Sequence, residues 1–264
     1  MYFSSYFTQH LKSVFLLTTL LVFFTAAAFG QYESRKGYAG FSIGASVPSG
    51  DFASISEKLE GAGYAKKGVA LNLNFAYRIA SNFGVTALLM IQSNKYDEDA
   101  FLKSLNTVSQ SNTNQVKYTS VDADSWGLSG FLVGGFISAP LDNRGKLILE
   151  PRALFGLLTA VSPRIRGTYR GSFSTGWIEQ QLGAGIAFGF SLGGGFRFNA
   201  SDRIALILNA DYLKTSPKFF DVAINQSNGQ DLVISFQKKI EVVNVTLGFA
   251  FRIKKDVPPI KRRI

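Results

Sequence analysis

The sequence predicts an all-β protein, an eight-stranded antiparallel transmembrane β-barrel with short periplasmic turns and long extracellular loops. Three observations favour this fold class. Eight segments alternate between apolar and small or polar residues, the connections between them alternate between short and long, and their polar face carries few charges. The first observation alone predicts a sandwich or a barrel, and the other two distinguish a membrane barrel from a soluble one.

The eight segments have the period of two residues that places side chains alternately on the two faces of a strand. In "EVVNVTLGFAFRI", for example, Val243, Val245 and Leu247 alternate with Asn244 and Thr246. The predicted strands are residues 37–47, 68–79, 83–95, 125–138, 145–159, 180–198, 203–214 and 241–253. Helical periodicity is hard to find in the rest of the chain after residue 30.

The connections differ in length in a regular order. Residues 80–82, 139–144 and 199–202 form tight turns, whereas residues 48–67, 96–124, 160–179 and 215–239 form long connections. Outer-membrane barrels combine short periplasmic turns, long external loops and an even number of strands. The alternation therefore predicts that both ends of the barrel domain are periplasmic and that the long connections are extracellular.

The composition of the two strand faces predicts that the apolar face points into lipid. In a soluble barrel the polar face meets water and is rich in Lys, Glu and Asp. Here it carries residues such as Gly40, Ser42 and Gly193, which suit the crowded lumen of an eight-stranded barrel. A soluble lipocalin-like barrel with its apolar face inward is the alternative, but its interior would have to enclose an excess of Phe.

Aromatic residues near the strand ends predict two interfacial girdles of the kind that membrane barrels carry. The predicted girdle on the short-turn side consists of Tyr77, Phe83, Phe136, Phe196, Phe198, Phe249 and Phe251. The predicted girdle on the long-loop side consists of Trp126 and Tyr212.

Composition divides the chain into three parts. Residues 1–30 have the features of a secretory signal peptide, because an apolar run over 14–24 precedes the small-x-small pattern "AFG" at 28–30. Residues 31–253 form the predicted outer-membrane barrel, and residues 254–264 form a basic periplasmic tail. A retained membrane anchor is the alternative for the apolar run, which is shorter than the about 20 residues of a spanning helix.

Both ends of the predicted barrel resemble a known group of proteins. "GYAGFSIGASVPSGDF" (37–52) is similar to the first strand and following loop of small outer-membrane barrels of the PorT-like and OmpA-barrel-like families, and "VNVTLGFAF" (243–251) is similar to their closing strand. The resemblance extends over essentially the whole chain after residue 30 and implies a location in the outer membrane of a Gram-negative cell envelope. It also implies that Phe251 belongs to a signal for the barrel-assembly machinery, although residues 254–264 follow it here.

The sequence offers no catalytic constellation, so we expect neither enzyme activity nor a cofactor. "GFSLG" (189–193) fits the G-x-S-x-G pattern, but it lies inside a predicted strand, and the single histidine of the chain, His10, lies in the signal segment. The lack of cysteine excludes disulfides and thiolate sites. The acids of "YDEDAF" (96–101) lack the spacing of a calcium loop, which favours a solvated loop over a metal site.

A sparse set of charged residues falls on the inward-facing positions of the predicted strands. These residues are Arg78, Lys146, Glu150, Arg152, Arg197, Asp211 and Arg252. Unpaired charges would be costly in a lumen, so we expect ion pairs, notably between Glu150 and neighbouring arginines. One interpretation is a structural plug, and the other is a narrow path that favours anions because basic residues outnumber acids.

The long connections carry many of the other basic residues of a chain whose formal net charge is +10. They are Lys58, Lys66, Lys67, Lys103, Lys117, Arg164, Arg166, Arg170, Lys218, Lys238 and Lys239. Such side chains can contact the phosphates of lipopolysaccharide, and ordinary solvated loops are the alternative.

These observations predict a monomeric, non-enzymatic outer-membrane protein with a structural or surface-interaction role. Its expected partners are outer-membrane lipid and lipopolysaccharide, with the barrel-assembly machinery during biogenesis, and no nucleic acid. A narrow, anion-favouring small-solute channel is the alternative, although an eight-stranded lumen leaves little room for one.

Overall fold

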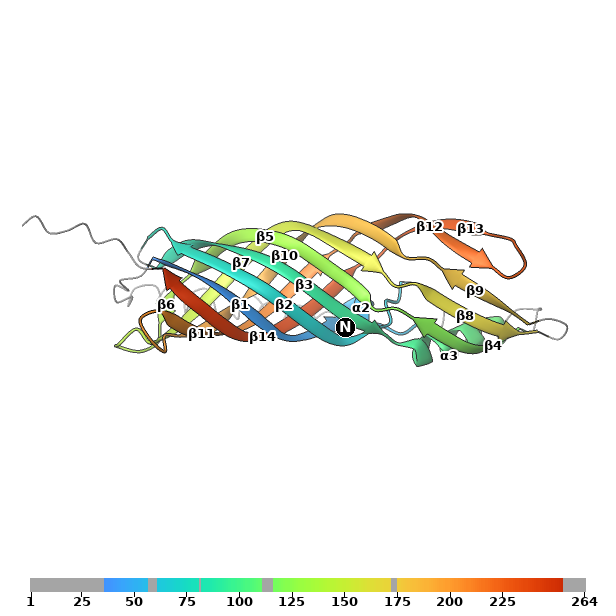
Figure 1. Cartoon of the computed structure of the whole chain (residues 1–264), viewed down its shortest axis with the longest axis horizontal. Coiled ribbons are helices and arrows are strands. Elements are labelled where there is room, and N and C mark those ends of the chain that lie inside the picture. The colour runs from blue at the N-terminus through green and yellow to red at the C-terminus, as the bar shows by residue number, and fades with distance from the viewer. Residues whose placement is uncertain (1–35, 57–60, 81, 111–115, 172–174, 254–264) are drawn as a thin grey trace, which may run out of the picture.

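The chain folds into a closed antiparallel barrel in a computed structural model that describes residues 36–56, 61–80, 82–110, 116–171 and 175–253 (Figure 1). In order around the ring, the barrel strands are β1 (Gly37–Ser49), β2 (Ala65–Arg78), β3 (Phe83–Tyr96), β5 (Trp126–Ile137), β7 (Leu147–Ser162), β10 (Gly183–Phe198), β11 (Ile204–Thr215) and β14 (Ile240–Ile253). A two-residue strand, β6 (Ala139–Pro140), pairs with β7. Each of the eight predicted segments overlaps one barrel strand, so the fold class is confirmed.

The ring closes because β1 and β14 pair along their whole length, from Gly37 opposite Ile253 to Ser49 opposite Glu241. The β10–β7 pairing completes the circuit on the other side. Each barrel strand therefore has a hydrogen-bonded neighbour on both sides, which is what hydrocarbon requires of the backbone. The predicted signal segment 1–30 and tail 254–264 lie outside the described residues.

The long connections contain regular structure, where the sequence analysis expected loops. A second sheet extends beyond one end of the barrel (Figure 1). Its strands are, in order, β13 (Leu232–Gln237), β12 (Lys218–Gln226), β9 (Thr175–Gln180), β8 (Ile165–Arg170) and β4 (Lys117–Ala123). We call this sheet, together with helices α2 (Gly50–Ala53) and α3 (Glu98–Gln110), the crown. By the asymmetry of outer-membrane barrels, the crown is extracellular.

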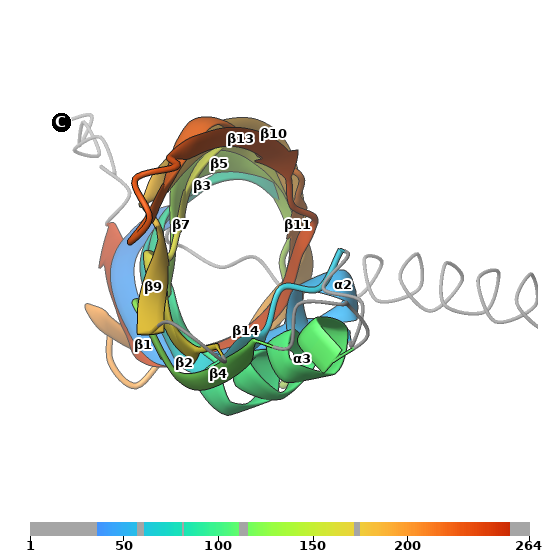
Figure 2. The ribbon, with the colours of Figure 1, turned by 90° about the vertical axis from the view of Figure 1, so that its right-hand side faces the viewer.

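Both helices belong to this crown and lie on the same side of the ring (Figure 2). The short α2 belongs to the β1–β2 connection, and α3 to the β3–β5 connection. Among the described residues, no helix combines the length and the apolar character needed to cross a membrane.

Outward-facing side chains of the barrel strands form an apolar belt. Phe188, the most exposed of them, keeps 77% of its surface accessible, and Phe41, Leu71 and Leu247 are also exposed. Water would disfavour so large an apolar surface, whereas a bilayer would cover it. The barrel is therefore an outer-membrane barrel, and the lipocalin-like alternative fails because the apolar face points outward.

Two of the predicted girdle residues point into the barrel instead. Phe136 and Trp126 are each only 5% exposed. Phe136 packs in the lumen with Tyr38, and the Trp126 indole donates a hydrogen bond to the Gly63 carbonyl at 3.0 Å. The other girdle residues on the short-turn side are exposed: Tyr77, Phe83, Phe196, Phe198, Phe249 and Phe251. The prediction for Phe136 and Trp126 was wrong because proximity to a strand end does not determine which face a residue occupies.

The lumen contains an apolar wall of leucines beside polar side chains, and β3 and β7 contribute to both. The inward side chains of β3, β5 and β7 include Leu88, Met90, Leu128, Leu132, Leu154 and Leu158, whereas those of β1, β2, β11 and β14 include Ser42, Asn72, Asn74, Asn209, Asn244 and Thr246. Leu132 is 0% exposed and Asn72 is 1% exposed, so the apolar and the polar side chains are both packed. Small and neutral residues dominated the predicted lumen, so this apolar wall was not predicted.

Candidate functional site

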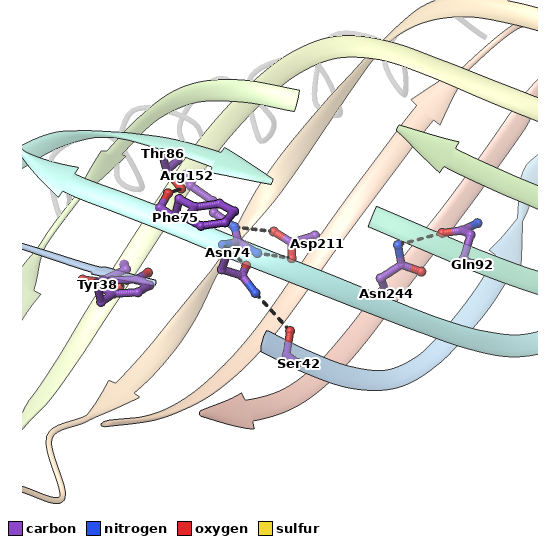
Figure 3. Close-up of polar contacts among 10 residues, drawn as sticks. Tyr38, Ser42, Asn74, Phe75, Thr86, Gln92, Arg152, Asp211 and Asn244 are labelled. Carbon is purple, nitrogen blue, oxygen red and sulfur yellow. Dashed lines mark hydrogen bonds and ion pairs between the residues drawn. The ribbon is translucent and has the colours of Figure 1, made fainter. Parts of the chain in front are cut away.

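The first candidate site is a pair of buried ion pairs on the inward faces of the barrel strands. Arg152 of β7 meets Asp211 of β11 through two hydrogen bonds, Nε to Oδ1 at 2.9 Å and Nη2 to Oδ2 at 2.6 Å. A third bond runs from Arg152 Nη1 to Asn74 Oδ1 at 3.1 Å (Figure 3). The Arg152 and Asp211 side chains are only 4% and 3% exposed. This bidentate geometry is the arrangement in which a buried ion pair is best satisfied.

The second ion pair joins Glu150 of β7 to Arg197 of β10. Arg197 donates from Nε and Nη2 to Glu150 Oε1 at 3.1 and 3.0 Å, and from Nη1 to Asn199 Oδ1 at 2.9 Å. The other carboxylate oxygen of Glu150 accepts a hydrogen bond from the Tyr38 hydroxyl at 2.8 Å. The Arg197 guanidinium also lies 5.2 Å from the centroid of the Tyr38 ring, within the range of a cation–π contact.

The structure thus joins four of the seven predicted luminal charges in two pairs, and it places the other three differently. Arg78 is buried at the short-turn end, where it lines the same small void as Glu150 and Arg197. Arg252 is half-buried at the rim and donates from Nη1 to the Ser201 carbonyl at 3.0 Å. Lys146 is exposed and precedes β7, which begins at Leu147, so its assignment to the lumen was wrong.

Glycines of β10 make room for the buried Arg–Asp pair. A Cβ atom on Gly193 would lie 2.6 Å from Asp211 Oδ1 and 2.3 Å from the Ala210 carbonyl oxygen. On Gly195 it would lie 2.1 Å from Asn209 Oδ1. The glycines of β10 therefore leave space for side chains of its two neighbours in the ring, β7 and β11, which meet over Gly193. Ser191 of the "GFSLG" segment is buried in the middle of the same strand.

Neutral side chains continue the polar network toward the crown (Figure 3). Asn74 Nδ2 donates to Ser42 Oγ at 3.2 Å, and Asn244 Nδ2 donates to Gln92 Oε1 at 2.9 Å. Gln92 Nε2 donates in turn to Asn94 Oδ1 at 3.3 Å. These bonds link β1, β2, β3 and β14 inside the barrel.

The second candidate site is a cavity of about 260 Å³ between the crown and the mouth of the barrel. Its wall includes Tyr64, Tyr96 and Phe101, whose ring centroids lie 5.1–5.7 Å apart. Trp126 and Phe236 also line the cavity. These five aromatic side chains come from five separate places: the loop before β2, the end of β3, the start of β5, helix α3 and strand β13. Nothing in the sequence pattern predicted that they lie together.

Tyr64 is held in the left-handed backbone region, with φ = 50°. This conformation costs a bulky residue about 1–3 kcal/mol and persists only where the surroundings impose it. The Tyr64 amide donates to the Ser54 carbonyl at 3.2 Å, its carbonyl accepts from the Asp97 amide at 2.7 Å, and its hydroxyl donates to the Ser56 carbonyl at 2.5 Å. Strain of this kind is characteristic of binding sites.

One cation, Lys238, lines the same cavity. Its ammonium group donates to the carbonyl oxygens of Gly61 at 3.3 Å and of Ala62 at 2.5 Å. Burial lowers the pKa of Lys238, and the nearby Asp51 carboxylate partly opposes this effect. Asp51 itself pairs with the neighbouring Lys239 at 3.5 Å.

The acidic segment 97–99 has structural partners in the crown. The Asp97 carboxylate accepts a hydrogen bond from the Ala100 amide at 3.1 Å at the start of α3 and pairs with Lys66 at 3.0 Å. Glu98 Oε1 accepts from the Ala123 amide at 2.9 Å, which joins α3 to β4. No group of three or more metal-ligating side chains occurs among the residues that the structure describes.

The outer tip of the crown brings two cations face to face. In the antiparallel β4–β8 pair, Lys117 lies directly opposite Arg170, and both side chains are exposed. Elsewhere in the crown several basic residues have acidic partners: Arg164 lies 3.5 Å from Asp124, and Arg166 lies 3.8 Å from Glu179.

A hollow of about 620 Å³ lies on the lipid-facing surface near the short turns. Its lining includes Phe75, Phe83, Gly135 and Phe155. The Phe83 ring lies over Gly135, where a Cβ atom would come within 3.2 Å of it. Because the hollow belongs to the apolar belt, it is a surface for lipid chains rather than for a soluble ligand.

Comparison with known proteins yields structural likeness alone. No family model matches the sequence, and no curated protein matches it. Ail, the attachment invasion locus protein of Yersinia pestis, has 13% identity and a TM-score of 0.40, over 83% of this chain and 99% of Ail. A major outer membrane protein from Thermus thermophilus has 13% identity and a TM-score of 0.41, over 81% of this chain and 99% of that protein.

The outer membrane protein OprG from Pseudomonas aeruginosa has 14% identity and a TM-score of 0.38, over 84% of this chain and 98% of OprG. At these values the likeness carries no functional assignment. The resemblance of the sequence to PorT-like and OmpA-barrel-like proteins stays a prediction.

Proposed function

We propose that this protein is a non-enzymatic outer-membrane barrel that acts through its crown, by binding the phosphate groups of lipopolysaccharide. The observation that carries the proposal is the Lys117–Arg170 pair at the crown tip. Like charges directly opposite each other on paired strands are destabilising. A phosphate between them would replace repulsion by two charge-assisted contacts.

The surroundings of this pair support the same role. Lys103 is exposed on α3, and α3 is attached to β4 by the hydrogen bonds between Asn106 and the Tyr118 backbone. A rigid, structured crown presents these cations at lower entropic cost than flexible loops would. The outer leaflet around the barrel is the nearest source of phosphate groups.

The narrow anion-favouring channel is the weaker candidate. It is favoured by the polar luminal wall, where Asn72 Oδ1 and Thr246 Oγ1 have no partner among the described residues. Against it, Arg152 and Arg197 are each paired with a carboxylate, and leucines of β3, β5 and β7 fill part of the lumen. Paired charges and packed leucines fit a plug that stabilises the interior better than a path for ions.

The test compares binding of phosphorylated and dephosphorylated lipopolysaccharide core by the protein in lipid nanodiscs. The double variant Lys117→Gln/Arg170→Gln should raise the Kd for the phosphorylated core about tenfold, or ~1.4 kcal/mol. Arg164→Gln is the matched control, because this arginine already has an acidic partner. Equal binding of both core forms by the unaltered protein would refute the phosphate role, and regular ion-conducting steps in a planar bilayer would favour the channel.

A further inference from the structure

The crown cavity has the features of a binding site for a small molecule, and this inference is independent of the proposed role of the crown tip. Its volume of about 260 Å³ is enclosed by residues from both the crown and the barrel mouth. Pockets that enclose drug-sized ligands measure about 300–1,000 Å³, so a ligand here would be smaller. Gln237 is exposed at the edge of the cavity, which therefore reaches the surface.

The aromatic wall of the cavity is fixed before any ligand binds. Phe101 packs edge-on against both Tyr64 and Tyr96, at centroid distances of 5.1 and 5.5 Å. Trp126 is fixed by its hydrogen bond to Gly63 and by an edge contact with Phe219 at 6.1 Å. A preformed aromatic wall binds an apolar body without a further ordering cost.

Lys238 gives the cavity a positive charge that forms no ion pair with any carboxylate of the described residues. Its two hydrogen-bond acceptors, the carbonyls of Gly61 and Ala62, are neutral. Among the described residues no carboxylate oxygen lies within 4.0 Å of its ammonium nitrogen, and the nearby Asp51 pairs with Lys239 instead. An ammonium group has three donors, so one remains for a ligand.

We propose that this cavity binds a small organic anion with an apolar body, an aromatic or short-chain carboxylate. The carboxylate pairs with Lys238, and the apolar body lies against the rings of Tyr64, Phe101 and Trp126. The side chain of Gln180, which also lines the cavity, adds a neutral polar contact that orients the ligand. Tyr64 is fixed in the left-handed backbone region, and backbone strain of this kind is expected at such a site.

The experiment uses the full chain in lipid nanodiscs with 3-phenylpropionate as the probe and 3-phenylpropanamide as its neutral counterpart. The chain has two tryptophans, so Trp177→Phe leaves Trp126 as the fluorescent reporter in the cavity wall. We expect the acid to change Trp126 fluorescence with a Kd at least tenfold below that of the amide. Titration calorimetry on the unaltered chain should likewise show tighter binding of the acid than of the amide.

Two substitutions test whether the charge of Lys238 itself, rather than that of a neighbouring lysine, determines binding of the acid. Lys238→Met should raise the Kd of the acid to that of the amide. Lys239→Met, one residue away, should raise the Kd of the acid far less, because it only frees the nearby Asp51 carboxylate. If Lys238→Met does not fold, Gln180→Glu serves instead. A negative charge in the lining should raise the Kd of 3-phenylpropionate and leave the Kd of the amide unchanged.

The proposal is overturned if the acid and the amide bind equally well to the unaltered chain, or if neither binds. It is also overturned if Lys239→Met raises the Kd of 3-phenylpropionate as much as Lys238→Met does. The Lys117→Gln/Arg170→Gln variant should bind 3-phenylpropionate normally, so failure of the lipopolysaccharide role would leave this result intact.

Discussion

Arg152 and Asp211 show what allows charge inside an eight-stranded barrel. The guanidinium satisfies both carboxylate oxygens and the Asn74 side chain at once, so neither partner is left with an unmet charge. Such a pair adds little net stability over an apolar pair. Removal of one partner, however, leaves the other charge buried and unpaired in a medium of low dielectric. The pair therefore fixes β7 and β11 relative to each other over Gly193 of β10, the strand between them.

Arg152→Met should destabilise the barrel by about 3–5 kcal/mol, because Asp211 would remain buried without a counter-charge. The measurement is the urea midpoint of unfolding in detergent, followed by gel mobility. Lys66→Met is the control, since Lys66 pairs with Asp97 from a side chain that is 48% exposed, and loss of this solvated pair should leave the midpoint nearly unchanged. Equal effects of the two substitutions would show that the luminal pair is not desolvated.

Gly193 of β10 lies close to the same ion pair, and its substitution tests this close approach. A Cβ atom there would lie 2.6 Å from Asp211 Oδ1, so Gly193→Ala should displace the carboxylate and cost about 1–3 kcal/mol. Gly127→Ala is the matched control, because its Cβ would meet Val161 at an ordinary 3.5 Å. Unfolding midpoints of the two variants should differ, and a smaller loss for Gly193→Ala than for Gly127→Ala would contradict the close approach.

At the scale of the element, the sequence predicted the barrel strands well because each repeats one apolar face over many residues. The crown strands escaped prediction since they are short, and β4, "KYTSVDA", carries polar residues on both faces. Helix α3 escaped because it begins directly at the acidic segment 97–99, which resembled a solvated loop. Residue parity placed Glu150 and Arg197 in the lumen, but parity could not predict the start of β7 beyond Lys146.

Asn106 makes two hydrogen bonds that dock α3 on β4, in addition to the bond between the Ala123 amide and Glu98. Asn106 Nδ2 donates to the Tyr118 carbonyl at 3.0 Å, and the Tyr118 amide donates to Asn106 Oδ1 at 2.8 Å, as a neighbouring strand would. Two such bonds contribute about 1–3 kcal/mol. Asn106→Ala should therefore speed hydrogen exchange of the Tyr118 amide by about tenfold or more.

Thr107→Ala is the control for this element, because the Thr107 hydroxyl donates to the Lys103 carbonyl within α3 itself. If both substitutions speed exchange of the Tyr118 amide equally, loss of helix stability rather than of docking would explain the effect.

At the scale of the whole molecule, the barrel and the crown share a core although their sheets are separate. Phe219 and Val222 of β12 pack in the same apolar cluster as Trp126, Leu158 and Leu213 of the barrel. The crown thus packs on the mouth of the barrel, and it carries exposed basic residues such as Lys103, Lys117 and Arg170.

This arrangement predicts that the crown can be shortened without loss of the barrel. The ring closes through barrel strands alone, so a variant with the β12–β13 hairpin replaced by a short turn should still run at a different apparent mass before and after boiling in detergent. Its urea midpoint should fall, because Trp126 and Leu213 lose the packing of Phe219. Phe220→Ala in the intact chain is the control, since Phe220 is 67% exposed on β12 and should leave the midpoint unchanged. Loss of the mobility shift in the shortened chain would mean that the crown is required for the ring to close, and that the two sheets form a single folding unit.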